Sequence, residues 1–212
     1  MGSYLVRRLL ATIPVLIGVA TLVFSLLHLV PGDPAVSMLG ESAAPEDVTA
    51  LRERLGLDRP LLEQYVGYMR GLARGDLGTS FRYNTPVTTE IVQRLPNTVR
   101  LAAAAMAVAL LIGIPLGVLG AVFKGRAVDH AAMAGSLVGV SVPAFWLGPM
   151  LALIFSVRLG LLPVSGTGSP AHLVLPAVTL GAALAAILAR ITRASVLEEL
   201  RELYVVAARA KG

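Results

Sequence analysis

The chain of 212 residues is 56% hydrophobic and 15% charged, with a mean hydropathy of +0.76, which is too apolar for a soluble surface and predicts an integral membrane protein. It contains no cysteine, and this excludes a disulfide scaffold, thiolate metal sites and cysteine nucleophiles. The formal net charge is +5, but the basic residues lie at the ends of apolar runs or beside acids, a pattern typical of membrane orientation and not of nucleic-acid binding.

The first apolar run extends from Leu9 to Val30. At about 1.5 Å per residue it is long enough to cross a hydrocarbon core about 30 Å thick. Arg7 and Arg8 before it resemble the start of a secretory signal, but the run is too long for a signal and no small-residue cleavage site follows it. Residues 1–30 are therefore predicted to form the N-terminus and an uncleaved first transmembrane helix.

Residues 31–96 form a polar insertion with nearly balanced charges between this span and the next. Pro45 at a helix start and Gly56 at a helix end predict a short amphipathic helix over 45–56. A second helix is predicted over 60–73 by the same signals. Two helices of this size bury too little apolar surface for an independent domain, so we expect the insertion to lie against the membrane body or a partner.

Three more apolar runs predict further spans within residues 97–189, namely Val99–Phe123, about Ala131–Val157, and Leu173–Ala189. Basic residues concentrate before the first span, in the loop after the second, and from Arg190 onward. By the positive-inside rule both chain ends, residues 190–212 included, are predicted to be cytoplasmic, and the 31–96 insertion extracytoplasmic. The expected fold is an all-α, polytopic membrane bundle with four spans and a small helical insertion.

Small residues recur in these spans, as the pairs Gly113 and Gly117 and Gly135 and Gly139, and as alanines over 182–189. Residues of this size let helix backbones approach closely, so we expect helix packing at these positions. Part of the pattern reflects the general frequency of small residues in membrane helices.

The stretch 141–148 combines the helix-breaking Pro143 with Phe145 and the single tryptophan, Trp146. Two interpretations stay open. Trp146 is either an anchor at the membrane boundary, where tryptophan is enriched, or a residue that packs inside the protein or lines a pathway, because it lies near the middle of its predicted span. Proline is tolerated within a span where the freed backbone groups find other partners or line a cavity.

The sequence predicts neither a catalytic nor a metal site. Its three histidines, His28, His130 and His172, are scattered at predicted span boundaries, a placement typical of interfacial residues. No charged side chain lies deep in a predicted span, which disfavours a proton-coupled carrier. There is also no G-x-x-x-x-G-K-[ST] phosphate loop, so ATP is not expected to bind this chain by that device.

Several ordered motifs point to one family. They are Pro31-Gly32-Asp33-Pro34, Leu55-Gly56-Leu57-Asp58-Arg59-Pro60-Leu61, Gln64-Tyr65, Gly75-Asp76-Leu77-Gly78-Thr79-Ser80, Arg94-Leu95-Pro96-Asn97-Thr98, the 141–148 stretch, Leu161-Leu162-Pro163 and Leu175-Pro176-Ala177. Together they cover essentially the whole chain and strongly resemble the dipeptide/oligopeptide/nickel permease subfamily of bacterial ABC importers.

The resemblance gives the last seven residues a role. Permeases of this type carry a cytoplasmic E-A-A-x-x-x-G loop that docks on the ATPase subunit, and here Val206 stands in place of the glutamate. The residues implied in ATPase coupling are Ala207, Ala208, Arg209, Lys211 and Gly212. Without the resemblance, the same residues would be interpreted as a basic tail attracted to anionic lipid.

The resemblance also implies an assembly in the bacterial inner membrane. A family permease has six spans, so the chain is expected to be truncated within the coupling loop. The expected partners are a second permease, two ATPase subunits that bind ATP and magnesium, and an extracytoplasmic solute-binding protein; no cofactor is expected in this chain. Dipeptides, longer peptides, glutathione-like compounds and nickel chelates remain open as substrates. The alternatives are a non-transporting membrane scaffold or inactive truncated permease and, third, a proton-coupled carrier.

Overall fold

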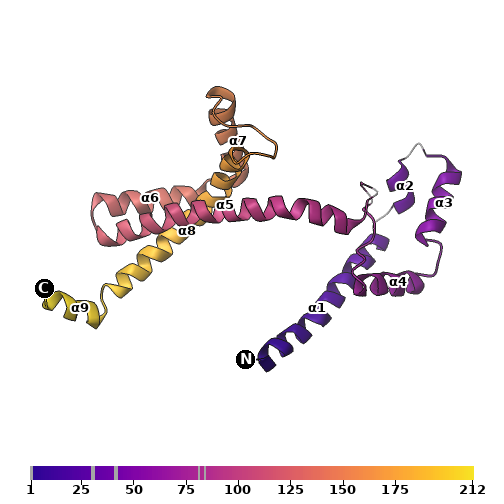
Figure 1. Ribbon diagram of the computed structural model, residues 1–212, viewed down its shortest axis with the longest axis horizontal. Helices are drawn as coiled ribbons and strands as arrows, with labels where there is room; N and C mark the ends of the chain where they lie inside the picture. Colours follow the sequence, from indigo (N-terminus) through magenta and orange to yellow (C-terminus); the bar gives the residue numbers. More distant parts are fainter. Residues whose placement is uncertain (1, 30–31, 41–42, 81, 84) are drawn as a thin grey trace. The chain divides into compact units, whose positions relative to one another are not determined.

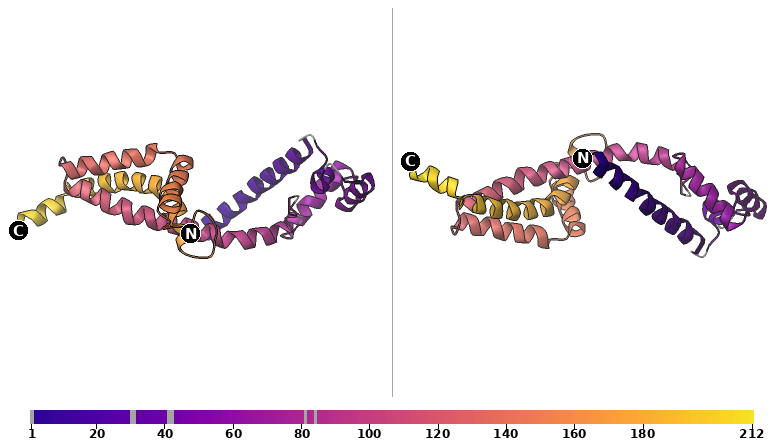
Figure 2. Two further views of the ribbon diagram at one scale, coloured as in Figure 1. Left: turned by 90° about the horizontal axis from the view of Figure 1, so that it is seen from above. Right: turned by 90° about the horizontal axis from the view of Figure 1, so that it is seen from below.

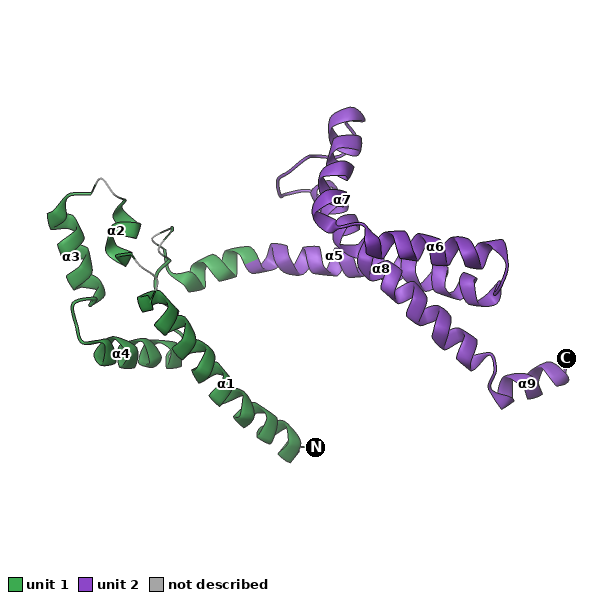
Figure 3. Cartoon of the chain, turned by 180° about the vertical axis from the view of Figure 1, so that it is seen from behind, with its two compact units in different colours: residues 1–94 green, residues 95–212 purple. Residues whose placement is uncertain are grey.

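Figure 1 shows the computed structural model of the chain, which describes residues 2–29, 32–40, 43–80, 82–83 and 85–212. The residues form two compact units, 1–94 and 95–212, which are coloured separately in Figure 3. Over the described ranges the regular secondary structure is helical, apart from one isolated bridge between Thr79 and Pro86. The all-α fold class is thereby confirmed.

Three helices of the described chain are long and apolar enough to cross a membrane: α1 (Gly2–Leu29), α5 (Val87–Val122) and α8 (Ala171–Glu199). A fourth crossing exists if one bent pair of helices counts as a single span. The polytopic character predicted from the apolar runs is therefore confirmed. Val30 and Pro31, at the predicted boundary between the first span and the insertion, lie outside the described residues.

The described residues of the insertion form three short helices before α5 begins. The two predicted ones are confirmed as α3 (Pro45–Leu55) and α4 (Leu61–Ala73). The third, α2 (Pro34–Leu39), was not predicted. It begins where Asp33 accepts a hydrogen bond from the Ala35 N–H (2.9 Å) and Pro34 occupies the first helical position. Arg52 of α3 pairs with the same carboxylate, and the hydrogen bond from Arg52 holds the pKa of Asp33 below its usual range.

Within the first unit, α4 lies against the C-terminal half of α1 (Figure 1). The hydroxyls of Thr21 and Tyr65 are 2.7 Å apart, and His28 Nε2 lies 3.2 Å from the side-chain oxygen of Gln64. The ring of Phe24 meets that of Tyr65 edge to face at 5.3 Å. These contacts attach the insertion to the first span, as expected for helices too small to fold alone.

The C-terminal end of α3 depends on Gly56. This residue has φ +67°, a left-handed conformation that favours glycine, and its N–H donates to the Glu53 carbonyl (3.0 Å). Replacing Gly56 by alanine is expected to destabilise the last turn of α3 by about 1 kcal/mol, which should speed hydrogen exchange of the Gly56 and Leu57 amides roughly fivefold. Gly67→Ala is the matched control, because Gly67 is inside α4 and an added Cβ would meet no atom within 4 Å. Equal exchange rates of the amides of residues 56 and 57 in the two variants would contradict the role of Gly56 as the left-handed cap of α3.

The helix that contains the second predicted span begins before the predicted span itself. The boundary between insertion and span was placed at Pro96, but α5 starts at Val87 and runs through Pro96 without ending. The Pro86 carbonyl accepts bonds from Thr89 and Glu90 (3.0 and 3.3 Å) and so begins the helix. A proline inside a helix removes one hydrogen bond, and here the turns on either side keep the helix continuous. A helix can extend beyond the membrane, so the boundary between insertion and span at Pro96 stays a prediction.

The third predicted span is not one straight helix. It consists of α6 (Ala127–Ser141), followed by α7 (Ala144–Leu151) and the π-helical η1 (Ala152–Arg158), and the two parts are bent by 100°. Val142 and Pro143 are extended, with ψ of 117° and 136°, because proline disfavours the helical conformation in the residue before it. The span predicted over about 131–157 is thus divided into two helical parts at Pro143, the residue that the sequence identified as helix-breaking.

The core of the second unit lies between α5, α6 and α8, which run side by side in Figure 2. It is built from small residues: the buried apolar side chains are alanines and one leucine, Leu175, among the described residues. α8 continues past Ala189, where the fourth span was predicted to end, as far as Glu199. After a turn the chain forms the last helix, α9 (Leu203–Ala210).

Candidate functional site

Helices α5 and α8 pack with their backbones in close approach. A Cβ added to Gly113 would lie 2.8 Å from the Ala185 carbonyl oxygen, and one added to Gly117 would lie 2.6 Å from that of Ala189. On α8, a Cβ at Gly181 would lie 2.8 Å from the carbonyl oxygen of α5 residue Ala105. These pairs follow one another in the same chain direction, so the two helices are parallel and joined by a stripe of small residues.

The two glycines singled out on α6 differ from each other. A Cβ at Gly139 would lie 3.0 Å from the Ala186 Cβ of α8, so this position is a tight helix contact. A Cβ at Gly135 would meet nothing within 4 Å in the described part of the chain. The structure therefore shows close packing at Gly139, and the packing expected at Gly135 has no counterpart within the described chain.

An ion pair joins α6 and α8 near the loop that precedes α6. Arg193 donates from Nε to Asp129 Oδ1 (2.6 Å) and from Nη2 to Oδ2 (2.7 Å), a two-bond geometry that fits guanidinium to carboxylate. The Gly125 N–H adds a third bond to Oδ2 (2.9 Å). The Asp129 side chain is 5% exposed and that of Arg193 25%, so both charges are largely removed from solvent.

Helix α5 covers this ion pair. A Cβ at Gly120 would lie 3.3 Å from Arg193 Cδ and 3.4 Å from Asp129 Oδ1, so all three helices meet at one point. In the sequence, Asp129 lies just after the basic loop that follows the second predicted span, and Arg193 belongs to the basic residues from Arg190 onward. The sequence did carry a signal, since an acid at the start of a span and a base just beyond another can face each other, but the partner could not be named without the helix packing.

The residues implied in ATPase coupling lie together in α9 and directly after it. Ala207, Ala208 and Arg209 are in the helix, Lys211 is its C-cap, and Gly212 has φ +100°. All five are exposed. The helix also exposes large apolar side chains, with Leu203 at 83% and Tyr204 at 64%. α9 thus presents alanines, two cations and an uncovered apolar surface at the end of the second unit.

One side-chain contact ties α9 back to α8. The Tyr204 hydroxyl donates to Glu199 Oε2 (2.7 Å), across the turn that separates the two helices. The hydrogen bond to Glu199 raises the pKa of the Tyr204 phenol, so the hydroxyl keeps its proton throughout the physiological pH range. The position of α9 is therefore linked to the end of α8 by a side chain as well as by the backbone.

The aromatic residues after the bend line an apolar hollow of about 550 Å³. Phe145 and Trp146 are 81% and 52% exposed, and both follow Pro143 in the first turn of α7. The hollow is lined on the other side by the end of α6, including Leu137 and Ser141. The structure thus brings the three residues of this motif to one surface, next to the break in the third span.

The histidines do not gather into a metal site in the described ranges, where no group of three or more histidine, aspartate or glutamate side chains could hold a metal ion. His28 hydrogen-bonds to Gln64, and His172 Nδ1 lies 2.8 Å from the Ser169 hydroxyl. Each of these two rings is thus held by a neutral polar partner.

Comparison with known proteins covers nearly the whole chain. Residues 1–102 match the N-terminal family of binding-protein-dependent transport system membrane components, and residues 113–212 match the family described as binding-protein-dependent transport system inner membrane component. The whole chain is similar to 72% of a dipeptide transport system permease protein from Alkalihalophilus pseudofirmus, with 42% identity. It is also similar to 69% of the glutathione transport system permease proteins of Escherichia coli O6:H1 and Salmonella choleraesuis, with 43% and 44% identity.

These matches agree with the structure, which has apolar helices long enough to cross a membrane and packed through small residues. Family and helices together support a multi-pass inner-membrane protein. The resemblance seen in the sequence motifs is confirmed. This chain belongs to the family of inner-membrane permease components of binding-protein-dependent transport systems.

Proposed function

We propose that this permease moves peptides or related small solutes across the bacterial inner membrane, driven by ATP hydrolysis in partner subunits. The observation that carries the proposal is the exposed helix α9, which follows directly on the packed helices of the second unit. The assembly would contain a second permease, two ATPase subunits that bind ATP and magnesium, and an extracytoplasmic solute-binding protein. The N-terminus, the Lys124–Arg126 turn and α9 would face the cytoplasm, in line with their basic residues.

The surface of α9 suits a protein groove. Alanines at 207, 208 and 210 allow a partner backbone to come close, and the exposed Leu203 and Val206 offer apolar area for burial. Arg209 and Lys211 supply positive charge for acidic groups at the rim. A short helix with these features is typical of a helix that docks into a hydrophobic groove.

The contacts of α9 offer a route for movement into the membrane helices. A shift of α9 would act on α8 through the turn and the Tyr204–Glu199 hydrogen bond. α8 in turn is joined to α6 by Asp129 and Arg193 and to α5 by the glycine stripe. Because tightly packed helices move as rigid elements, docking and release at α9 would tilt α8 with its neighbours. This motion would switch the pathway between its outward-facing and inward-facing states.

The names of the relatives indicate the chemical class of the solute, and the hollow at the bend indicates part of its path. The relatives are named for dipeptide and glutathione transport, and both compounds are small and carry free carboxylates, so we infer a solute of this class. The hollow at Pro143, Phe145 and Trp146 is apolar and lies at the break in the third span. We infer that these residues line the pathway, since irregular backbone at membrane depth is found where it borders a cavity.

The docking proposal is tested by placing acidic residues on α9, as Ala208→Glu and Gly212→Glu, in the complete importer. Each change introduces a charge and bulk into the expected contact, so ATPase co-purification and ATP-dependent uptake should both fall about tenfold or more, while membrane insertion is retained. Ala50→Glu is the matched control, since Ala50 is an exposed alanine of α3 far along the chain from α9. Unchanged co-purification and uptake in both α9 variants would refute the docking role. Uptake that follows the proton gradient and ignores ATP depletion would support the carrier alternative instead.

A further inference from the structure

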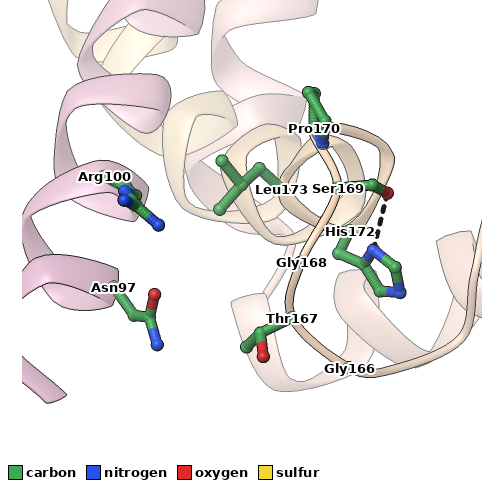
Figure 4. A pocket seen from close by; sticks show the side chains of 9 residues that line it. All are labelled: Asn97, Arg100, Gly166, Thr167, Gly168, Ser169, Pro170, His172 and Leu173. Atoms are coloured by element: carbon green, nitrogen blue, oxygen red, sulfur yellow. Dashed lines mark hydrogen bonds between the residues drawn. The ribbon is translucent and has the colours of Figure 1, made fainter. Parts of the chain in front are cut away.

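A cavity of about 280 Å³ lies in the second unit, between α5 and the loop that leads into α8. Figure 4 shows its walls: Asn97 and Arg100 extend from α5 on one side, and the loop from Gly166 to Pro170 curves around the other. Asn97 and Arg100 are three positions apart, which places them on the same face of the helix. Its volume is just below the range of about 300–1,000 Å³ that is typical of small-molecule pockets, so it suits part of a small solute.

Among the described residues that line the cavity, Arg100 carries a positive charge and none is an aspartate or glutamate. None of the ion pairs found in the described ranges involves Arg100. A guanidinium at the wall of a partly enclosed cavity without a balancing acid attracts an anion, and its planar donor set fits a carboxylate with two parallel hydrogen bonds.

The loop opposite Arg100 contains two glycines in conformations that favour glycine, and with no Cβ at these positions a solute could approach the backbone. Gly166 and Gly168 have φ of +116° and +125°, values that L side chains rarely adopt. A Cβ at Gly166 would lie 3.1 Å from His172 Nε2, so the His172 ring packs directly against the loop. Ser169 holds the other ring nitrogen of His172 at 2.8 Å, as the dashed line in Figure 4 shows. The His172 ring thus contacts the loop at Gly166 and Ser169, and Thr167 is also among the residues that line the cavity.

We propose that this cavity is an entry subsite that binds a free carboxylate of the transported solute, with Arg100 as its ion-pair partner and Asn97 as an amide donor. The inference rests on the proposed transport function. By the predicted topology the cavity is at the extracytoplasmic end of α5 and α8, where a solute would first reach the permease. Arg100 would receive the carboxylate and orient the solute before the pathway opens.

The test changes Arg100 in the permease and the carboxylate in the solute, separately and together. It uses the complete importer, reconstituted in vesicles with its binding protein. ATP-dependent uptake of alanyl-alanine and of alanyl-alanine amide is measured for the unchanged permease and for Arg100→Gln. Arg100→Gln should lower the ratio of acid to amide uptake about tenfold, since it removes a charge-assisted contact that only the acid can make. Selection by the binding protein is the same for both permeases and so cancels from the comparison.

Two further variants separate charge from structure. Arg100→Lys keeps the charge and should restore most of the ratio, while Arg70→Gln, which removes an exposed arginine of α4, should leave it unchanged. If Arg100→Gln does not assemble with the ATPase subunits, Asn97→Ala provides the same comparison with a smaller expected drop. Equal losses of acid and amide uptake would overturn the proposal. Weakened association of the binding protein with Arg100→Gln would overturn it as well, in favour of a docking contact.

Failure of this inference is distinguishable from failure of the transport proposal. If the unchanged importer shows no ATP-dependent uptake of any peptide, the proposed function is wrong. If the unchanged importer transports alanyl-alanine and Arg100→Gln leaves the acid-to-amide ratio unaltered, transport stands and only the carboxylate subsite is refuted.

Discussion

Replacing Arg193 by methionine is expected to lower the melting temperature of the purified permease complex by about 10 °C. The change removes two of the three hydrogen bonds to Asp129 and leaves its carboxylate, 5% exposed, with the Gly125 N–H as its remaining donor in the described structure. Loss of one partner from a buried pair costs much more than loss of both, because it leaves an uncompensated charge. The measurement is thermal unfolding in detergent or lipid nanodiscs, followed by the fraction of complex that stays soluble.

A single and a double variant serve as controls for Arg193→Met. Arg190→Met removes an exposed arginine from the same helix, for which the described chain shows no ion pair, and should shift the melting temperature little. The double variant Asp129→Leu with Arg193→Met removes both charges and should recover most of the lost stability. Uptake should remain low in the double variant if the ion pair also transmits movement from α8 to α6. A similar loss in Arg190→Met and Arg193→Met would show that the pair has no special role.

Gly117→Val is expected to destabilise the packing of α5 on α8 by about 3 kcal/mol, at the upper end of the range for overpacked sites. An added Cβ would lie 2.6 Å from both the Ala189 carbonyl oxygen and the Thr192 Cβ. Atoms this close cannot be accommodated by a side-chain rotation, since one of them belongs to the backbone, so the two helices must move apart. Thermal unfolding of the complex and uptake of alanyl-alanine would both report the change.

Gly135→Val is the matched control for this substitution. Gly135 also lies inside a membrane helix, but a Cβ there would meet nothing within 4 Å in the described part of the chain. Its replacement should therefore change stability by less than about 1 kcal/mol. Comparable losses at both positions would contradict the packing of α5 on α8 as the reason for the effect at Gly117.

Much of the secondary structure follows from local sequence signals. Pro45 and Gly56 predict the ends of α3 to within one residue, because a proline suits the first helical position and a glycine the left-handed cap. The apolar runs predict the membrane-spanning helices, because their length alone decides whether they can cross a bilayer. The start of α5 was missed, since Pro96 resembles a boundary and yet lies inside a helix that begins at Val87.

The sequence by itself determined the helical membrane architecture, the family and the position of the α9 motif, because each depends on residues that are neighbours along the chain. The tertiary structure alone decided which small residues touch, that Asp129 faces Arg193, that the third span bends by 100°, and that Arg100 lines a cavity with a loop distant in sequence. These features depend on the rotation and separation of whole helices. Helix packing is set by the sum of many weak contacts along each interface, and no short motif specifies that sum.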